Sequence, residues 1–586
     1  MMKEHNIYDF LKFKNIEHVV INRSGTEIAA LVSSTYKEYK NKNYKKYIYI
    51  YDLNLNLKNK IEGYGLKSLN YSDDDRLLYV EDNLINVINN NDKLTVKFDG
   101  KIDEAKWFKN NILFSATLNN NEKEDDAYFF EESDLLNELY LLDFHKGIRK
   151  ITDNISIFEF DNYNDNIYAL TSDCPQESCW YKSKLSKIDL DGNVKEIYDP
   201  KFRQIGKLRA YKNKIAFLES VMSDRGVISG DVILIDNNNV KNLTENSDST
   251  YSHIEFYNDD IYVLENHMAE FRIKNLNNNK ILWNGSGIVY PVFSPEFSMH
   301  GNKFVFSYSN ENDIAEIILL NDKIKKSNIN DELKDLRPYK NELIQWKSVD
   351  DKEIYGFFRS QNPEDPLVVY IHGGPTSFSY PAFIDRTTMY LGSGFSVFMP
   401  NYRGSIGKGR KYAESNLGDL GGKDFDDIIL GIKYLYENKI IKTDRIYITG
   451  GSYGGYISAL AIMKIDIFKA SVSLYGISDW ISFHGVSNLY DWDRIHMDEN
   501  PYNFNKYDKF SVIRMKHDVK TPVLLMHGIE DPYVPVGQYY EFYRFLKENN
   551  KAVKLLLYPR EGHGFTEKEH MIKQYNETID FFNRYK

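Results

Sequence analysis

The feature that most constrains this chain is a serine between glycines where a strand gives way to a helix. Residues 445–449 form a short apolar run typical of a buried strand, and the turn that follows reads Gly450-Gly451-Ser452-Tyr453-Gly454-Gly455. Residues 456–463 then have the composition of a helix. On so sharp a turn the serine hydroxyl projects from the sheet edge, and residues two before and two after must lack a side chain because strand and helix pass closely. The pattern predicts that Ser452 is a nucleophile.

The same pattern predicts where a histidine partner should lie. In an α/β-hydrolase fold the catalytic triad follows the chain order serine, acid, histidine. Two histidines follow the region of the candidate acid, His563 and His570. His570 falls within residues 566–585, which are expected to form a helix, whereas His563 lies in a loop directly after the apolar strand 553–558. Elimination leaves His563 as the predicted general base.

The acid follows from a second buried-strand pattern at residues 522–526. The loop that leaves this strand reads His527-Gly528-Ile529-Glu530-Asp531-Pro532. Asp531 is preferred over Glu530 because a short carboxylate beside Pro532 orients an imidazole with less freedom. In isolation the loop would be an ordinary Asp-Pro turn. Between Ser452 and His563 in the chain, it completes the predicted triad of Ser452, Asp531 and His563.

A glycine pair supplies candidates for an oxyanion hole. The strand-like run 367–371 is followed by His372-Gly373-Gly374-Pro375, and two glycines after a strand leave backbone N–H groups uncovered. We predict that the amides of Gly374 and Tyr453 stabilise the oxyanion, where one fixed donor contributes about 2.7–4 kcal/mol. His372 is expected to be a structural hydrogen-bonding residue. All four pieces follow the ends of separate strands, which places them at one edge of a single sheet.

The first half of the chain has a different texture. Residues 16–335 contain strand pairs punctuated by asparagine and aspartate, with almost no helical periodicity. Turn-plus-strand units begin near residues 20, 70, 107, 160, 208, 255 and 292. Their mean spacing of roughly 45 residues is the size of a four-stranded propeller blade. The count predicts seven blades, with six or eight blades and a pair of β-sandwiches as alternatives. The first fifteen residues are expected to form a short helix outside the propeller.

From residue 338 onward, strands alternate with helical segments such as 425–437 and 537–549. This alternation is typical of a largely parallel sheet with helices on both faces. We therefore predict an all-β N-terminal propeller plus a C-terminal α/β-hydrolase domain. The expected boundaries are 1–337 for the short helix and propeller, and 338–586 for the catalytic domain.

Composition limits the partners and the compartment. The formal net charge of −11 makes nucleic acid an unexpected partner. No run approaches the ~18 apolar residues of a membrane span, and the first residues lack the apolar stretch of a signal peptide. Cys174 and Cys179 are close enough for a disulfide or half a metal site, but no histidine stands nearby, so free thiols in a reducing cytoplasm are expected.

With these residues identified, the C-terminal part resembles the catalytic domain of the prolyl oligopeptidase family, in particular its acylaminoacyl-peptidase branch. The resemblance spans about residues 340–586. It rests on the motifs His372-Gly373-Gly374-Pro375, Asn401-Tyr402-Arg403-Gly404-Ser405-x-Gly407-x-Gly409, Gly418-Asp419-Leu420-Gly421-Gly422-Lys423-Asp424, Gly451-Ser452-Tyr453-Gly454-Gly455-Tyr456, His527-Gly528-x-x-Asp531-x-x-Val534-Pro535 and Gly562-His563-Gly564. The family pairs this domain with a seven-bladed propeller, in agreement with the repeat count.

The resemblance implies a serine peptidase that cleaves short peptides, with the propeller covering the site and excluding folded proteins. It also implies a pocket for the residue before the scissile bond, made apolar and aromatic by Ile477, Trp480, Phe483, Tyr453 and Val534. Ordinary core packing is the alternative role for these side chains.

One position departs from the family pattern. Family members often carry an arginine two residues after the catalytic aspartate, where this chain has Tyr533. A neutral phenol cannot form the same charge-assisted pair with a substrate carbonyl or carboxylate. Substrate preference is therefore not transferred from any one member.

The predicted reaction is acyl transfer through an acyl-enzyme, without a metal or an organic cofactor. A carboxylesterase on the same scaffold is the first alternative, because ester and amide hydrolysis share every catalytic group. A non-catalytic propeller that binds partner proteins is the second. Short peptides are the expected partners, neither nucleic acid nor membrane is expected, and assembly into a homo-oligomer is left open.

Overall fold

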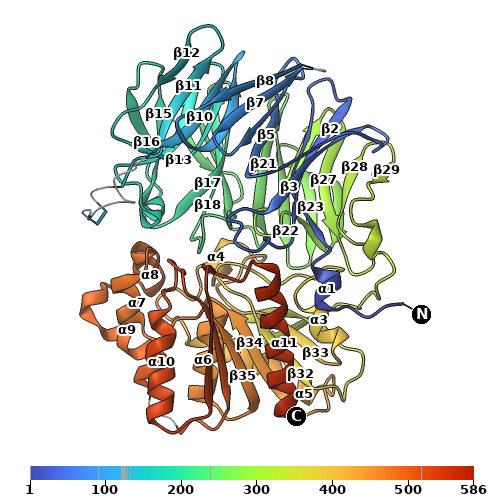
Figure 1. Ribbon diagram of the computed structural model, residues 1–586, viewed down its shortest axis with the longest axis vertical. Helices are drawn as coiled ribbons and strands as arrows, with labels where there is room; N and C mark the ends of the chain where they lie inside the picture. The colour runs from blue at the N-terminus through green and yellow to red at the C-terminus, as the bar shows by residue number, and fades with distance from the viewer. Residues whose placement is uncertain are drawn as a thin grey trace.

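The computed structural model describes residues 2–89, 92–119, 127, 130–131, 134–237, 239–515 and 518–586. It shows two domains stacked on one another (Figure 1). The upper domain in that view is a ring of antiparallel sheets, and the lower one has a central sheet with helices packed on its faces. The short helix α1 (Ile7–Phe10) precedes the ring in the chain but lies beside α3 and α11 of the lower domain.

Seven sheets of consecutive antiparallel strands form the ring, which confirms the predicted seven-bladed propeller. Six blades have four strands and the last has five. The strands in chain order are β1 (Lys14–Ile21), β2 (Glu27–Ser34), β3 (Lys45–Asp52) and β4 (Leu57–Tyr64); β5 (Leu66–Tyr71), β6 (Leu77–Glu81), β7 (Leu84–Asn89) and β8 (Asp92–Lys97); β9 (Gly100–Phe108), β10 (Asn111–Leu118), β11 (Glu138–Asp143) and β12 (Gly147–Lys150); β13 (Ser156–Tyr163), β14 (Asn166–Ser172), β15 (Lys184–Ile188) and β16 (Val194–Tyr198); β17 (Gln204–Tyr211), β18 (Lys214–Ser220), β19 (Asp231–Asp236) and β20 (Asn239–Asn242); β21 (Thr250–Tyr257), β22 (Asp260–His267), β23 (Glu270–Asn275) and β24 (Lys280–Ser286); and β25 (Ile288–Tyr290), β26 (Phe297–His300), β27 (Lys303–Ser309), β28 (Glu316–Leu320) and β29 (Ile324–Lys326).

The asparagine and aspartate residues that punctuate the first half supply the hairpin turns. Between β21 and β22, Asn258 and Asp259 have φ angles of 49° and 70°. Positive φ at both central positions is the requirement of a two-residue turn whose twist matches that of the strands, and these side chains tolerate it. The composition that suggested the repeats thus has a direct steric reason.

The ring closes between its first and last blades without a shared strand. Apolar residues of β1 and β2, including Ile16 and Ile28, pack against Val305 and Ile317 of the last blade. The Asn330 side chain also accepts a hydrogen bond from the Lys14 amide (2.8 Å) and donates one to the Lys14 carbonyl (3.1 Å). Closure therefore depends on side-chain packing and on one amide that satisfies the edge of β1.

The lower domain is built on an eight-stranded sheet in the order β30-β31-β33-β32-β34-β35-β36-β37, parallel from β33 onward. This arrangement confirms the predicted α/β-hydrolase domain. Its strands are β30 (Glu342–Lys347), β31 (Glu353–Arg359), β32 (Leu367–Ile371), β33 (Ser396–Asn401), β34 (Ile446–Gly451), β35 (Phe468–Leu474), β36 (Val523–Gly528) and β37 (Val553–Tyr558). Its α-helices are α3 (Thr388–Gly392), α4 (Arg410–Ala413), α5 (Lys423–Glu437), α6 (Tyr453–Lys464), α7 (Trp480–Val486), α8 (Tyr490–Met497), α9 (Asn505–Phe510), α10 (Gly537–Glu548) and α11 (Lys568–Arg584).

The propeller rests on the edge of the sheet where the parallel strands end. The amide of Gly407 donates to Thr250 Oγ1 (2.9 Å), and the amide of Met268 donates to the Gly407 carbonyl (2.8 Å). The Thr376 amide donates to Ser223 Oγ of the propeller (2.8 Å). These bonds hold the two domains together through polar backbone groups that would otherwise be buried without partners.

The expectation of free thiols is wrong. Cys174 and Cys179 form a disulfide, which closes a short loop at the start of the 3-10 helix η1 (Glu177–Lys182). The two residues are brought together because that helical turn folds back on β14, so that Cys179 is buried. Sequence spacing permitted either state, and only the path of the backbone decides between them.

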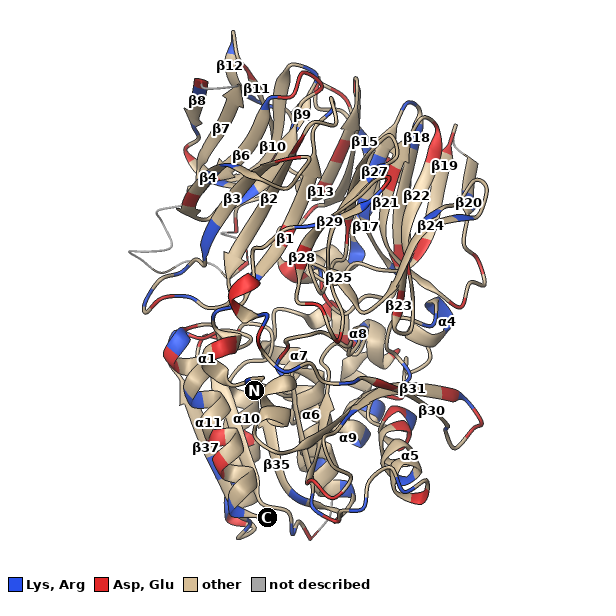
Figure 2. Cartoon of the chain, turned by 90° about the vertical axis from the view of Figure 1, so that its right-hand side faces the viewer, with Lys and Arg blue, Asp and Glu red and all other residues tan. Residues whose placement is uncertain are grey.

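Charged residues of both signs are interspersed over both domains (Figure 2). Among the helices of the described residues, none is both long and apolar enough to cross a membrane.

One buried ion pair should contribute strongly to the stability of the lower domain. Arg403 follows β33 and contacts Asp427 of α5 through its Nε and Nη2 atoms, each at 2.9 Å, with both side chains almost fully buried. Asp427→Ala removes the fully buried partner but leaves the pair between Arg403 and Asp350 (2.8 Å), so we expect a loss of about 1.5–3 kcal/mol. The loss should appear as a lower denaturant midpoint. Asp426→Ala, one residue away on α5, is the control and should change stability by less than about 0.5 kcal/mol. Equal midpoints for the two variants would contradict this prediction.

Candidate active site

The turn that carries Ser452 has the geometry that the sequence predicts. Strand β34 ends at Gly451 and helix α6 begins at Tyr453, with Ser452 between them at φ 59° and ψ −121°. This is a strained conformation for a residue with a side chain. A Cβ on Gly454 would clash with the carbonyl oxygen of Ile371, so a side chain cannot be accommodated there. The close passage of α6 over β32 forces the turn and leaves the serine at the edge of the sheet.

Asp531 and His563 are joined by a hydrogen bond. His563 Nδ1 lies 2.8 Å from Asp531 Oδ2, and Asp531 Oδ1 accepts from the amides of Tyr533 and Val534, each at 3.0 Å. Burial raises the pKa of the Asp531 carboxyl, but hydrogen bonds from His527 and His563 outweigh it and bring the pKa to about 2. The carboxylate is therefore ionised near neutral pH and orients the imidazole so that Nε2 is available to a substrate-side partner.

Tyr475 links this pair to the serine turn. Its ring lies 5.0 Å from the His563 ring in an edge-on arrangement. A Cβ on Gly451, the residue before Ser452, would lie 2.5 Å from the Tyr475 hydroxyl. Within the part of the chain that the structure describes, no hydrogen bond joins Ser452 Oγ to His563. Such bonds are often long in a free enzyme and shorten when substrate binds.

The glycines after β32 lie against the serine. A Cβ on Gly373 would be 3.3 Å from Ser452 Cβ and 3.9 Å from its Oγ, so the loop passes directly beside the hydroxyl. Gly374 has a φ of 114°, which strains any other residue. Tyr453 is the first residue of α6, where an amide has no acceptor within the helix. Among the hydrogen bonds of the described residues, neither the Gly374 amide nor the Tyr453 amide donates to a protein acceptor.

His372, expected to be structural, is held by hydrogen bonds at both ring nitrogens. Its Nε2 lies 2.8 Å from Ser405 Oγ and its Nδ1 lies 2.7 Å from the Gly373 carbonyl. Burial lowers the pKa of His372 to about 4. It is therefore a neutral side chain that supports the glycine loop.

The side chains proposed for an apolar substrate pocket are buried. Ile477, Trp480, Phe483 and Val534 are each at most 3% exposed. Trp480 packs against Phe483 and also against Trp492. This is the packing of a protein core, so the pocket stays a prediction for these four residues.

Tyr533, which replaces the family arginine, is half-buried. Its ring lies 5.6 Å from that of His563, in an edge-on contact. The imidazole ring of His563 therefore contacts both Tyr475 and Tyr533.

Tyr453 directs its side chain away from the site. Its hydroxyl donates to Asp424 of α5 and accepts from the Gly421 amide at 3.1 Å. The expectation that this ring lines the pocket is not supported, because helix α6 turns it into the core. Only its backbone amide remains at the site.

Sequence reasoning missed two side chains that support the predicted site, those of His527 and Ser223. His527 Nε2 lies 2.7 Å from the Val534 carbonyl and also faces Asp531, so it holds the acid loop closed. The signal was present, since His527 begins the motif that contains Asp531. The second is the propeller loop after β18, where Ser223 accepts from Thr376 beside the glycine loop. No local pattern marks that serine, because its role arises from domain docking.

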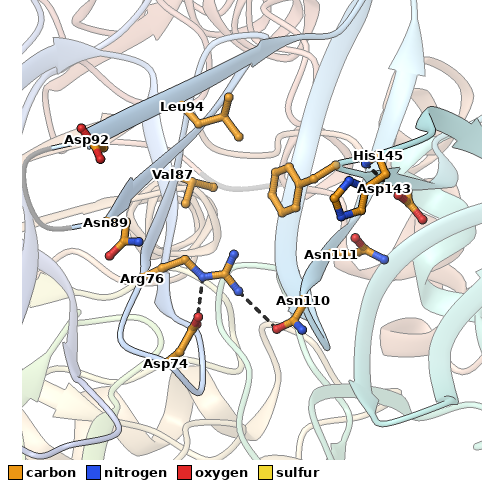
Figure 3. A pocket seen from close by; sticks show the side chains of 11 residues that line it. Asp74, Arg76, Val87, Asn89, Asp92, Leu94, Asn110, Asn111, Asp143 and His145 are labelled. Carbon is orange, nitrogen blue, oxygen red and sulfur yellow. Dashed lines mark hydrogen bonds and ion pairs between the residues drawn. The ribbon is translucent and has the colours of Figure 1, made fainter.

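An open depression with a volume of about 650 Å³ lies on the propeller, between its second and third blades (Figure 3). Arg76 at its floor is bonded to Asp74 (2.8 Å) and Asn110 (3.3 Å). The depression shares none of its lining residues with the predicted site.

Comparison with known proteins identifies the lower domain. Residues 381–586 match the model of the prolyl oligopeptidase family. An uncharacterized peptidase, YuxL, of Bacillus subtilis (strain 168) is 32% identical over 229 residues, which is 38% of this chain and 34% of the relative. The acylamino-acid-releasing enzyme of Arabidopsis thaliana is 32% identical over 232 residues, 38% of this chain and 30% of that enzyme. The chain thus spans about a third of the length of the curated relatives it matches.

Solved structures match over the whole chain. The acylaminoacyl peptidase of Pyrococcus horikoshii superposes with a TM-score of 0.84 at 20% identity, and the match covers 99% of this chain and 97% of that one. A puromycin-hydrolyzing peptidase of Mycobacterium tuberculosis gives a TM-score of 0.76 at 15% identity, covering 100% and 96%. At these identities the likeness establishes the fold, a propeller joined to an α/β-hydrolase domain. The lower domain matches the prolyl oligopeptidase family over residues 381–586 and is similar in sequence to acylamino-acid-releasing enzymes.

The buried hydrogen bond between the Tyr453 hydroxyl and Asp424, behind Ser452, should make the stability of the protein depend on pH. Burial raises the pKa of Asp424 from 3.8 to about 7. A carboxyl whose pKa is raised by folding contributes stability below its unfolded pKa and loses it as pH rises through the folded pKa, here from about 4 to about 7. Asp424→Asn cannot ionise, so the variant should gain stability relative to the native protein between pH 5 and pH 8.

Thermal midpoints measured at the two pH values test this prediction. Asp426→Asn, which changes a less buried neighbour on α5, is the control. A difference between Asp424→Asn and the native protein that is the same at pH 5 and pH 8 would disprove the pKa assignment.

Proposed function

We propose that this protein is a serine peptidase that hydrolyses short peptides through Ser452, His563 and Asp531. The observation that carries the proposal is the Asp531–His563 pair at 2.8 Å, located at the same sheet edge as the strained turn of Ser452. A buried carboxylate, an imidazole and a serine on separate loops are the three components of a serine acyl-transfer site.

In the proposed mechanism, Ser452 Oγ attacks the peptide carbonyl carbon while His563 Nε2 takes the hydroxyl proton. Asp531 fixes the tautomer through the Nδ1–H bond and stabilises the imidazolium. The amides of Gly374 and Tyr453 donate to the oxyanion of the tetrahedral intermediate. His563 then gives its proton to the leaving amine, and the C–N bond breaks. A water molecule, deprotonated by His563, hydrolyses the acyl-enzyme and restores the serine.

Substrate size is proposed to be limited by the propeller, which covers the sheet edge that carries these residues. The names of the relatives support N-acylated peptides or short oligopeptides as substrates. A pocket for an apolar residue at Ile477, Trp480, Phe483 and Val534 remains a prediction from the sequence. Cytoplasmic location, assembly into a homo-oligomer and the absence of nucleic-acid and membrane partners remain predictions from the sequence.

Ser452→Ala should abolish turnover and leave the fold intact. Without the nucleophile, kcat for a blocked aminoacyl anilide is expected to fall by at least about 10⁴-fold. A fluorophosphonate should label the native protein at Ser452 and leave this variant unlabelled. Ser415→Ala, a partly buried serine after α4, is the control and should keep full activity. Peptide turnover by Ser452→Ala would refute the assignment.

Asp531→Asn should preserve the geometry but favour the wrong imidazole tautomer, since an amide can donate to Nδ1. We expect kcat to fall by about 10⁴-fold with little change in the thermal midpoint. A loss of less than tenfold would show that another acid orients His563.

An esterase would use the same groups. Parallel assays with an acyl-aminoacyl anilide and a p-nitrophenyl ester separate the two functions, because a dedicated esterase hydrolyses the ester and leaves the amide intact.

A further inference from the structure

An arginine that the proposed mechanism does not use lies between the two domains. Residues 375–387 run from the glycine loop to α3, and the propeller contacts them at both ends. Near the start, Thr376 donates to Ser223, and further along, the Phe383 amide donates to Ser309 Oγ (3.2 Å). Arg386 stands at the end of this segment with its side chain exposed to solvent.

Arg386 has no acidic partner among the residues that the structure describes. Among the described residues, no carboxylate lies within ion-pair distance of its guanidinium, whereas Arg359 and Arg403 of the same domain each bind an aspartate. The neighbouring Asp385 is already committed to Arg359, at 2.8 Å. An arginine keeps its charge at all physiological pH values, so this cation is held in the interdomain space without an anion.

Phenols from several elements interact with the guanidinium, those of Tyr370 and Tyr475 through hydrogen bonds. They belong to Tyr44 in the loop between β2 and β3, Tyr370 at the end of β32, and Tyr475 after β35. Burial raises the pKa of Tyr370 to about 12 and also raises that of Tyr44, so both remain neutral hydroxyls that can donate. A guanidinium with neutral hydroxyl donors beside it can bind a carboxylate, which accepts two parallel hydrogen bonds from one guanidinium.

Tyr475 places Arg386 relative to the reaction. The same ring that lies against Arg386 makes the edge-on contact with His563 and approaches Gly451. His563 is proposed to deliver the proton to the leaving amine, so an anion bound at Arg386 would lie close to the group that receives this proton. Tyr533 occupies the position at which family members often carry an arginine. In this chain Arg386, from a different element, supplies a cation.

We propose that Arg386, with the hydroxyls of Tyr44, Tyr370 and Tyr475, binds the C-terminal carboxylate of the leaving group. The inference rests on the proposed peptidase function and adds a substrate class to it: short peptides with a free C-terminal carboxylate close to the scissile bond. Peptides that are extended or amidated at the C-terminus would not place a carboxylate beside Arg386.

The test compares acetyl-Phe-Ala as the free acid with acetyl-Phe-Ala-amide. A charge-assisted pair corresponds to roughly tenfold to hundredfold, so the native protein should favour the acid in kcat/KM by at least about tenfold. Arg386→Gln should bring the ratio of acid to amide close to one, mainly through KM, and Arg386→Lys should restore part of it. Arg584→Gln removes an exposed arginine on α11 that also has no acidic partner among the described residues, and it should keep the native ratio.

Two outcomes would overturn the inference: equal rates for acid and amide in the native protein, or an unchanged ratio in Arg386→Gln with a native thermal midpoint. A binding arm keeps it testable if no peptide is cleaved. Calorimetric titration of Ser452→Ala with the acid should give a dissociation constant at least about tenfold lower than titration of the Ser452→Ala, Arg386→Gln double variant, and equal constants would also overturn it. Failure of fluorophosphonate labelling at Ser452 would instead refute the proposed function alone.

Discussion

The close contact between helix α6 and the strands on either side of it is the constraint on which the site depends. Gly454 at the start of the helix faces the Ile371 carbonyl without room for a side chain, and Gly455 meets Leu474 in the same way. Because the helix backbone lies so close to both strands, the chain between β34 and α6 turns through a single strained residue, Ser452. Substitution at these glycines would move the helix and therefore Ser452, the Tyr453 amide and the glycine loop together.

Docking of the propeller imposes a second constraint on the same edge. The loop between β2 and β3 pairs with the segment after His563: the Lys37 amide donates to the Thr566 carbonyl at 2.7 Å, and the Lys568 amide donates back at 3.1 Å. On another side, Ser223 holds the segment that leads from the oxyanion loop to Arg386. The loop of His563 and the glycine loop after β32 are thus each supported by both domains. Domain separation would loosen the positioning of both groups, because neither loop is held by the catalytic domain alone.

Much of the architecture could be predicted from local pattern. The seven expected blade starts each fall within eight residues of the first strand of a blade, because hairpin turns favour asparagine, aspartate and glycine where φ is positive, as at Asn258 and Asp259. The alternation of strands and helices after residue 338 predicted the parallel sheet for an equally local reason. The pairing of His563 with Asp531 followed from chain order, since parallel strands bring their carboxyl ends to one edge. By contrast, the state of Cys174 and Cys179 depended on a backbone path that no spacing rule contains.

By itself the sequence determined the strand-turn-helix around Ser452, the repeat that builds the ring, and which acid and which histidine meet. Each is a property of residues close together in the chain or of the order in which strands follow one another. Only the tertiary structure decided that Trp480 and Phe483 are packed like core residues, that the Tyr453 ring turns inward, and that Arg386 lies beside Tyr475 without an acidic partner among the described residues. Those outcomes depend on how helices cover the sheet and how two domains meet, and long-range packing of that kind leaves no periodic trace in the sequence.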